Sequence, residues 1–226
     1  MREGRRIAFL AASADGFIAD AHGQVGWLDA FGGAADFGFD DFVGGVDALL
    51  MGRRTFDQLA GFGGPWPYGS RPVLVLTHRP LPPNAPASVR GADEAETAEA
   101  LSGAPGRIWI VGGGETLGVY LRRRLIDEIH LFTMPILLGE GVSLASGLGG
   151  AIPLALAASE ALAHGVTKAV YRPLPRGPAD TQTGAVALKP LATPNEEGLA
   201  TGPGAVTTPE AGEWPYPAEA NVEKDA

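Results

Sequence analysis

Three consecutive glycines, Gly112 to Gly114, stand between an apolar run and a segment of helical character in the string VGGGET over 111–116. Glycine has no Cβ, so its backbone can adopt positive φ angles and approach a ligand closely. The first N–H groups of a following helix lack partners within the helix and favour an anion. The segment therefore predicts either a phosphate cradle or a tight strand-to-helix turn, and its spacing alone does not separate the two. It matches neither the GxGxxG dinucleotide pattern nor the GxxxxGK[ST] nucleotide loop.

A second strand, glycine and helix sequence, LLMGRRTFDQL, spans 49–59. Arg53 and Arg54 follow Gly52 where the helix is expected to begin, and cations at a helix N-terminus oppose the helix dipole. A bound anion would offset that repulsion, which favours a phosphate site at this position. Thr55 adds a hydroxyl group and a backbone N–H donor.

A third polar group, Thr77-His78-Arg79, ends the apolar run at 72–77. It is either an ordinary solvated loop or part of a site, because ligands of open α/β sheets bind beyond the carboxyl ends of the strands. Together the three strand ends offer two amide cradles and several arginines. That supply suits a pyrophosphate and one further phosphate, which predicts NADPH rather than NADH as the cofactor.

The elements that must position these residues follow from hydrophobic patterning. Apolar runs of strand length, continuous rather than alternating, are typical of parallel strands buried on both faces. They lie at 7–12, 46–52, 72–77 and 107–112, and the expected helices lie at 36–44, 54–60, 93–101 and 116–124.

After the last of these helices the pattern changes. Residues 126–138 predict one long strand, and 154–163 with 166–172 predict a hairpin turning at His164-Gly165, although the Ala- and Leu-rich segment 154–163 also suits a helix. We therefore expect an α/β fold with a mainly parallel central sheet, flanked by helices and closed by a C-terminal antiparallel hairpin.

Charge and proline are unevenly distributed along the 226 residues, whose net charge is −9. Residues 1–172 hold 18 acidic and 14 basic side chains, net −4, whereas 173–226 hold 8 and 3, net −5, with 9 of the 19 prolines. This predicts one folded domain over 1–172 and a disordered, acidic, Pro-rich tail over 173–226.

Composition also excludes several classes of function. An acidic chain lacks the basic field that nucleic acid requires, and the absence of cysteine removes thiol chemistry. No apolar stretch approaches about 18 residues, and the histidines have no metal-ligand spacing. We expect a cytoplasmic protein that binds a small molecule, with no metal and no nucleic-acid or membrane partner.

Seven short strings, in this order, resemble the dihydrofolate reductase-like superfamily, and in particular the bacterial family related to the C-terminal reductase domain of the riboflavin-pathway deaminase/reductase. The resemblance covers about residues 5–172. The strings are SADGFIA (13–19), GQVGWL (23–28), LLMGRRTF (49–56), WPY (66–68), VLTHRP (75–80), VGGGET (111–116) and DEIHLFTMPILLGEG (127–141).

The resemblance implies a role for each matching residue. Those expected at NADPH are Ala11 and Ile18 beside the nicotinamide, Gly52, Arg53, Arg54 and Thr55 at the adenosine-side phosphates, Thr77, His78 and Arg79 at the 2′-phosphate, and Val111, Gly112, Gly113, Gly114, Glu115 and Thr116 at the pyrophosphate. Those expected at the substrate are Ser13, Trp27 and Asp29, with Asp15 either acting on substrate or capping its turn.

The resemblance implies an NADPH-dependent reductase of the 5-amino-6-(5-phosphoribosylamino)uracil reductase type, and a homodimer. Asp29 comes earlier after Trp27 than the carboxylate that supports pterin protonation in dihydrofolate reductases. The alternatives are a dihydrofolate or pteridine reductase, a non-catalytic NADPH-binding module, and an interaction protein that acts through its tail.

Overall fold

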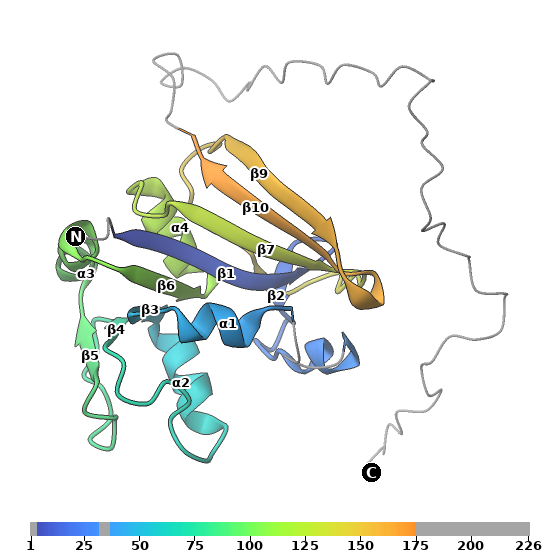
Figure 1. The fold of residues 1–226 in the computed structure, drawn as a ribbon. Helices are drawn as coiled ribbons and strands as arrows, with labels where there is room; N and C mark the ends of the chain where they lie inside the picture. The colour runs from blue at the N-terminus through green and yellow to red at the C-terminus, as the bar shows by residue number, and fades with distance from the viewer. Residues whose placement is uncertain (1–3, 32–36, 175–226) are drawn as a thin grey trace, which may run out of the picture. The chain divides into compact units, whose positions relative to one another are not determined.

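An eight-stranded, mostly parallel sheet forms the centre of the computed structural model, which describes residues 4–31 and 37–174 (Figure 1). The strand order is β5-β4-β3-β6-β1-β7-β10-β9, and pairing is parallel from β5 through to β7. The last two strands form an antiparallel hairpin against β7. The expected fold class is thereby confirmed.

The strands of this sheet coincide with the apolar runs of the sequence. Their bounds are β1 Arg5–Ser13, β3 Ala48–Gly52, β4 Val73–Leu76, β5 Val89–Ala92, β6 Arg107–Gly112, β7 Glu128–Met134, β9 Leu154–Ala161 and β10 Thr167–Pro173. A separate two-stranded sheet pairs β2 (Phe17–Ala19) with β8 (Val142–Ser143).

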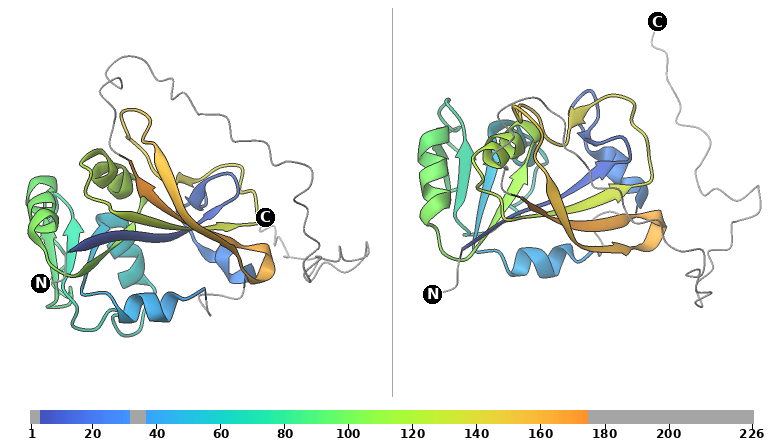
Figure 2. Two further views of the ribbon diagram at one scale, coloured as in Figure 1. Left: turned by 45° about the horizontal axis from the view of Figure 1, so that its top comes forward. Right: turned by 90° about the horizontal axis from the view of Figure 1, so that it is seen from above.

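Helices cover both faces of the sheet (Figure 2). Phe42 of α1 and Phe56 of α2 belong to one buried cluster, and Leu101 of α3 and Leu117 of α4 belong to the cluster on the other face. The helices span Phe39–Gly44 (α1), Arg53–Gly61 (α2), Glu94–Gly103 (α3) and Gly114–Arg122 (α4). All four were predicted, with ends that differ by at most three residues, as is usual at helix termini.

The ends of several strands differ from those that hydrophobic patterning predicts. β7 ends at Met134, before Pro135, which has no N–H to continue the ladder. The segment expected at 154–163 is a strand rather than a helix, and its turn contains a short 3₁₀ helix in which His164 has a φ of 58°. β2, β5 and β8 were not predicted, since they are short and interrupted by polar or small residues.

The predicted tail, 173–226, lies outside the described residues from position 175 onward. Among the helices in the described ranges, none has the length and apolar character needed to cross a bilayer.

The hairpin strand β9 forms one edge of the sheet and is exposed along nearly all of its length. Leu154 and Leu156 are among its exposed residues. The homodimer stays a prediction, and this apolar edge is a surface that such a dimer could cover.

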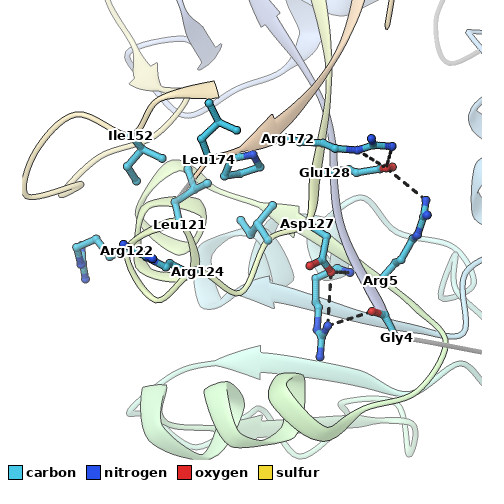
Figure 3. Close-up of a pocket in the computed structure, with 13 residues that line it drawn as sticks. Gly4, Arg5, Leu121, Arg122, Arg124, Asp127, Glu128, Ile152, Arg172 and Leu174 are labelled. Atoms are coloured by element: carbon cyan, nitrogen blue, oxygen red, sulfur yellow. Dashed lines mark hydrogen bonds and ion pairs between the residues drawn. The ribbon is translucent and has the colours of Figure 1, made fainter. Parts of the chain in front are cut away.

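A buried carboxylate links side chains of neighbouring strands at the end of the sheet where β1 and β7 begin (Figure 3). The side chain of Glu128 is 10% exposed and accepts hydrogen bonds from Arg5 Nη1 at 3.3 Å and Arg172 Nη2 at 3.1 Å. His130 Nε2 lies 3.3 Å from its second oxygen. Burial raises the pKa of Glu128, but the hydrogen bonds of His130 and Arg172 and the charge of Arg5 outweigh burial, so the pKa lies below its ordinary value.

We predict that Glu128→Gln lowers the free energy of unfolding by about 2 kcal/mol near pH 7, because charge-assisted hydrogen bonds are lost at a buried site. The folded-state pKa is depressed, so this contribution is complete above the unfolded value of about 4.3 and is lost as the pH falls through the folded value. Urea unfolding of both proteins across this range is the measurement.

Glu160→Gln is the matched control, since Glu160 is half-exposed and pairs with Lys168 at 2.9 Å. It should change stability by less than about 1 kcal/mol. An effect of Glu128→Gln that is as large near pH 3 as near pH 7 would contradict this account.

Candidate functional site

Two cavities open at opposite ends of the central strands. One, of about 510 Å³, lies where β1 and β7 begin, and its acidic groups Asp127 and Glu128 are paired with arginines of the same cavity (Figure 3). The other, of about 780 Å³, lies beyond the carboxyl ends of β1, β3, β4 and β6. The second cavity is the candidate site, because it collects strand ends and helix N-termini whose polar groups face a ligand-sized space.

Nearly all the residues expected at the cofactor line this one cavity. They come from five separate segments: Ala11 and Ile18; Gly52, Arg53, Arg54 and Thr55; Thr77, His78 and Arg79; Val111; and Gly113, Gly114, Glu115 and Thr116. Gly112 is buried and is absent from the lining.

The glycine loop joins β6 to α4 and needs glycine for two physical reasons. Gly112 has a φ of 120°, which side-chain-bearing residues rarely adopt. Gly114 begins α4 against the backbone of Ser143, and a Cβ there would collide with the Ser143 carbonyl oxygen. Gly113 N–H donates to Thr55 Oγ1 at 3.1 Å, which fastens the loop to α2. Gly113 to Thr116 line the cavity, so the N-terminus of α4 faces it, as a phosphate cradle requires.

The two arginines at the start of α2 differ in their freedom. Arg53 is only 19% exposed: its Nε donates to Asp57 Oδ1 at 2.7 Å, and its Nη1 donates to the Pro80 carbonyl oxygen at 2.8 Å. Arg54 is 89% exposed and lies 3.8 Å from Glu115. Arg53 is thus already committed to holding the loop after β4, whereas Arg54 can reorient toward a ligand.

The loop after β4 is held in shape by its own threonine. Thr77 Oγ1 accepts the Arg79 N–H at 3.0 Å, and the Thr77 N–H donates to the Ala92 carbonyl oxygen at 2.9 Å. The Arg79 side chain is 71% exposed, and its Nη2 lies 4.0 Å from Asp57 Oδ2. Arg79 is therefore the cation of this loop that is best placed to meet an incoming phosphate.

Asp15, expected to be either catalytic or a turn cap, makes the contacts of a cap. Ser13 Oγ donates to its Oδ1 at 2.5 Å, and the backbone N–H groups of Leu138 and Gly139 donate to its two oxygens at 3.1 and 2.7 Å. The Ser13 hydrogen bond lowers the pKa of Asp15, and the two backbone donors add to this effect against a smaller rise from burial. Neither Ser13 nor Asp15 lines the cavity.

The other residues expected at the substrate, Trp27 and Asp29, lie on the 3₁₀ helix Gly26–Phe31 and also fall outside the lining. Trp27 is partly buried and packs against the hydrophobic cluster that contains Phe42 and Phe56, and its indole N–H has no hydrogen-bond partner among residues 4–31 and 37–174. Asp29 is exposed. The structure thus brings nearly all the expected cofactor residues into one cavity, whereas the expected substrate residues lie outside its lining.

The cavity also contains residues that the sequence did not predict. Pairing of β2 with β8 brings Val142, Ser143 and Ser146 to the cavity wall, where the Ser146 N–H donates to the Gly114 carbonyl oxygen at 3.1 Å. Gln58 reaches across to donate to the Gly23 carbonyl oxygen at 3.0 Å. The remaining unpredicted residues of the lining are Phe9, Leu10, Ala19, Gly23, Val25, Leu28, Leu76, Glu94 and Val119.

Over the residues that the structure describes, no cluster of three or more His, Asp or Glu side chains is arranged to hold an ion. The donor set of the cavity instead consists of backbone amides, hydroxyl groups and guanidinium groups, which suits phosphate oxygens.

Comparison with known proteins agrees with this architecture. Residues 66–168 match the family model of the RibD C-terminal domain. The chain is 31% identical over 144 residues to the uncharacterized protein YwjB of Bacillus subtilis, covering 63% of this chain and 83% of that protein.

Two solved structures extend the match to three dimensions. A "Putative riboflavin biosynthesis protein" from Shewanella sp. PV-4 is 31% identical, with a TM-score of 0.66 over 76% of this chain and 99% of that one. The deaminase/5-amino-6-(5-phosphoribosylamino)uracil reductase of Thermotoga maritima shares the fold at 17% identity, with a TM-score of 0.57 over 76% of this chain and 57% of that one. The chain therefore belongs to the RibD C-terminal domain family, a reductase-like family with the dihydrofolate reductase-like fold.

Proposed function

We propose that this protein is an NADPH-dependent reductase that delivers a hydride to a small heterocyclic substrate of the 5-amino-6-(5-phosphoribosylamino)uracil type. The observation that carries the proposal is the convergence of the glycine loop, the start of α2 and the loop after β4 on one cavity of about 780 Å³. Those three segments supply donors for a pyrophosphate and for a separate phosphate, the anionic groups by which NADPH is recognised.

Each segment has a distinct part in the proposed complex. The N-terminus of α4 would hold the pyrophosphate, and Arg79 with Thr77 would meet the 2′-phosphate. Ala11 and Ile18, partly buried at the end of β1 and in β2, would frame the nicotinamide without competing polar groups. NADPH supplies the hydride, and the protein contributes binding, orientation and exclusion of water.

The choice of a pyrimidine over a pterin substrate is supported by Asp29. In this structure Asp29 is exposed and outside the cavity lining, so Asp29 is not placed to support pterin protonation. We therefore expect the full chain to oxidise NADPH with the phosphoribosylaminouracil and to leave dihydrofolate unreduced. Following the loss of NADPH absorbance with each compound tests this; binding without turnover of either substrate would favour the non-catalytic alternative.

Cofactor discrimination should depend on Arg79 more than on Arg53. Arg79→Ala should weaken NADPH about tenfold, or about 1.4 kcal/mol, with little effect on NADH, because its exposed guanidinium meets only the extra phosphate. Arg53→Ala should weaken both dinucleotides, since Arg53 holds the backbone of the loop. Fluorescence titration measures all four dissociation constants.

Arg90→Ala is the matched control, because Arg90 is similarly exposed, pairs with Glu96 at 3.9 Å and lies outside the cavity. It should change neither affinity. Equal losses of NADPH and NADH affinity in Arg79→Ala would remove the 2′-phosphate assignment.

We propose that Asp15 orients its turn rather than transferring a proton. Asp15→Asn removes the charge that accepts two backbone N–H groups and the Ser13 hydroxyl, so it should lower the melting temperature while kcat falls less than about threefold. Loss of a general acid or base would cost about a hundredfold or more in kcat. Steady-state kinetics beside thermal unfolding separates the two roles, and a hundredfold fall in kcat at unchanged melting temperature would overturn the capping role.

A further inference from the structure

We propose that Asp57 is an internal anion that competes with the cofactor's 2′-phosphate for Arg79, and so limits discrimination between NADPH and NADH. This role rests on the proposed function and adds a specificity-determining residue to it. Asp57 lies on α2, one turn after Arg53, and is outside the cavity lining.

The two oxygens of the Asp57 carboxylate face two different guanidinium groups. Oδ1 accepts from Arg53 Nε at 2.7 Å, and Oδ2 lies 4.0 Å from Arg79 Nη2. Both arginines line the cavity, whereas the Asp57 carboxylate lies outside the lining and is 45% exposed. Asp57 therefore partly neutralises the cations that the cavity presents to a ligand.

The two contacts have different consequences. The short contact, together with the bonds of Arg53 to the carbonyl oxygens of Arg79 and Pro80, fixes Arg53 as a strut between α2 and the loop after β4. The long contact is weak and exposed, so Arg79 can leave Asp57 for a phosphate at small cost. A phosphate held by Arg79 would nevertheless remain close to the Asp57 carboxylate, and the two negative charges would repel each other.

A nucleotide without the 2′-phosphate places no such charge beside Asp57. The repulsion therefore acts on NADPH alone, which makes the ratio of the two affinities the quantity that reports on Asp57. Screening by salt should reduce the effect, because both charges are partly exposed.

The test measures the dissociation constants of NADPH and NADH for the full-length wild type and for Asp57→Asn at low and high ionic strength. The variant keeps a side chain that can still accept a hydrogen bond from Arg53. We expect NADPH to bind about fivefold more tightly to the variant relative to NADH, with a smaller gain at high salt. Glu160→Gln makes the same change in net charge at a half-exposed ion pair outside the cavity, and should leave the ratio unchanged.

Three results would overturn the role of Asp57. An unchanged ratio would show that its charge does not reach the phosphate. A weakening of NADPH greater than that of NADH would show that Asp57 instead positions Arg79 for the phosphate. A wild type that binds neither dinucleotide would refute the proposed function itself, whereas the first two results leave NADPH binding intact.

Discussion

The parallel pairing of β3, β6 and β1 is the constraint on which the rest of the site depends. Parallel strands place their carboxyl ends at one edge, so the segments that follow β3 and β6 emerge side by side although they are about sixty residues apart in the chain. The hydrogen bond from Gly113 to Thr55 joins these two segments directly. β4 pairs in parallel with β3 as well, so the loop that carries Thr77 and Arg79 emerges at the same end of the strands.

Nearby carboxylates partly offset the positive charge of the arginines that line the cavity. Arg53 and Arg79 face Asp57, and Arg54 lies near Glu115, so each cation already has an acidic neighbour. Exposure differs sharply among the three arginines, and it is exposure that separates a structural arginine from one free to meet a ligand. At the other end of the strands the arginines have a structural role, because Arg5 and Arg172 pair with the buried carboxylate of Glu128.

Sequence reasoning predicted most strands of the sheet and most of the strand-end residues that line the candidate cavity, because both are encoded locally. The string VGGGET contains the strand end, the loop and the helix start, and neighbouring strings follow the same pattern. It did not predict that Arg53 would be committed to Pro80, because that contact joins positions 27 residues apart. The wall formed by Val142 and Ser143 was missed for the same reason, since the two-residue strand β8 exists only through its pairing with β2.

Motifs that carried the resemblance also proved to have different physical roles. In the WPY string, Trp66 and Tyr68 pack edge to face, and Tyr68 packs in the same way on Trp109, so these residues build the core rather than the cavity. Burial also raises the pKa of Tyr68 to about 12, as expected for a side chain of the core. A short string alone does not distinguish a residue that contacts a ligand from one that supports the surrounding structure.

A crystal structure of the complex with NADPH tests the central claim most directly. The account predicts the pyrophosphate at the N-terminus of α4, the 2′-phosphate within hydrogen-bond distance of Arg79, and the nicotinamide between Ala11 and Ile18. A dinucleotide bound at the opposite edge of the sheet, beside Arg5 and Arg172, would contradict it.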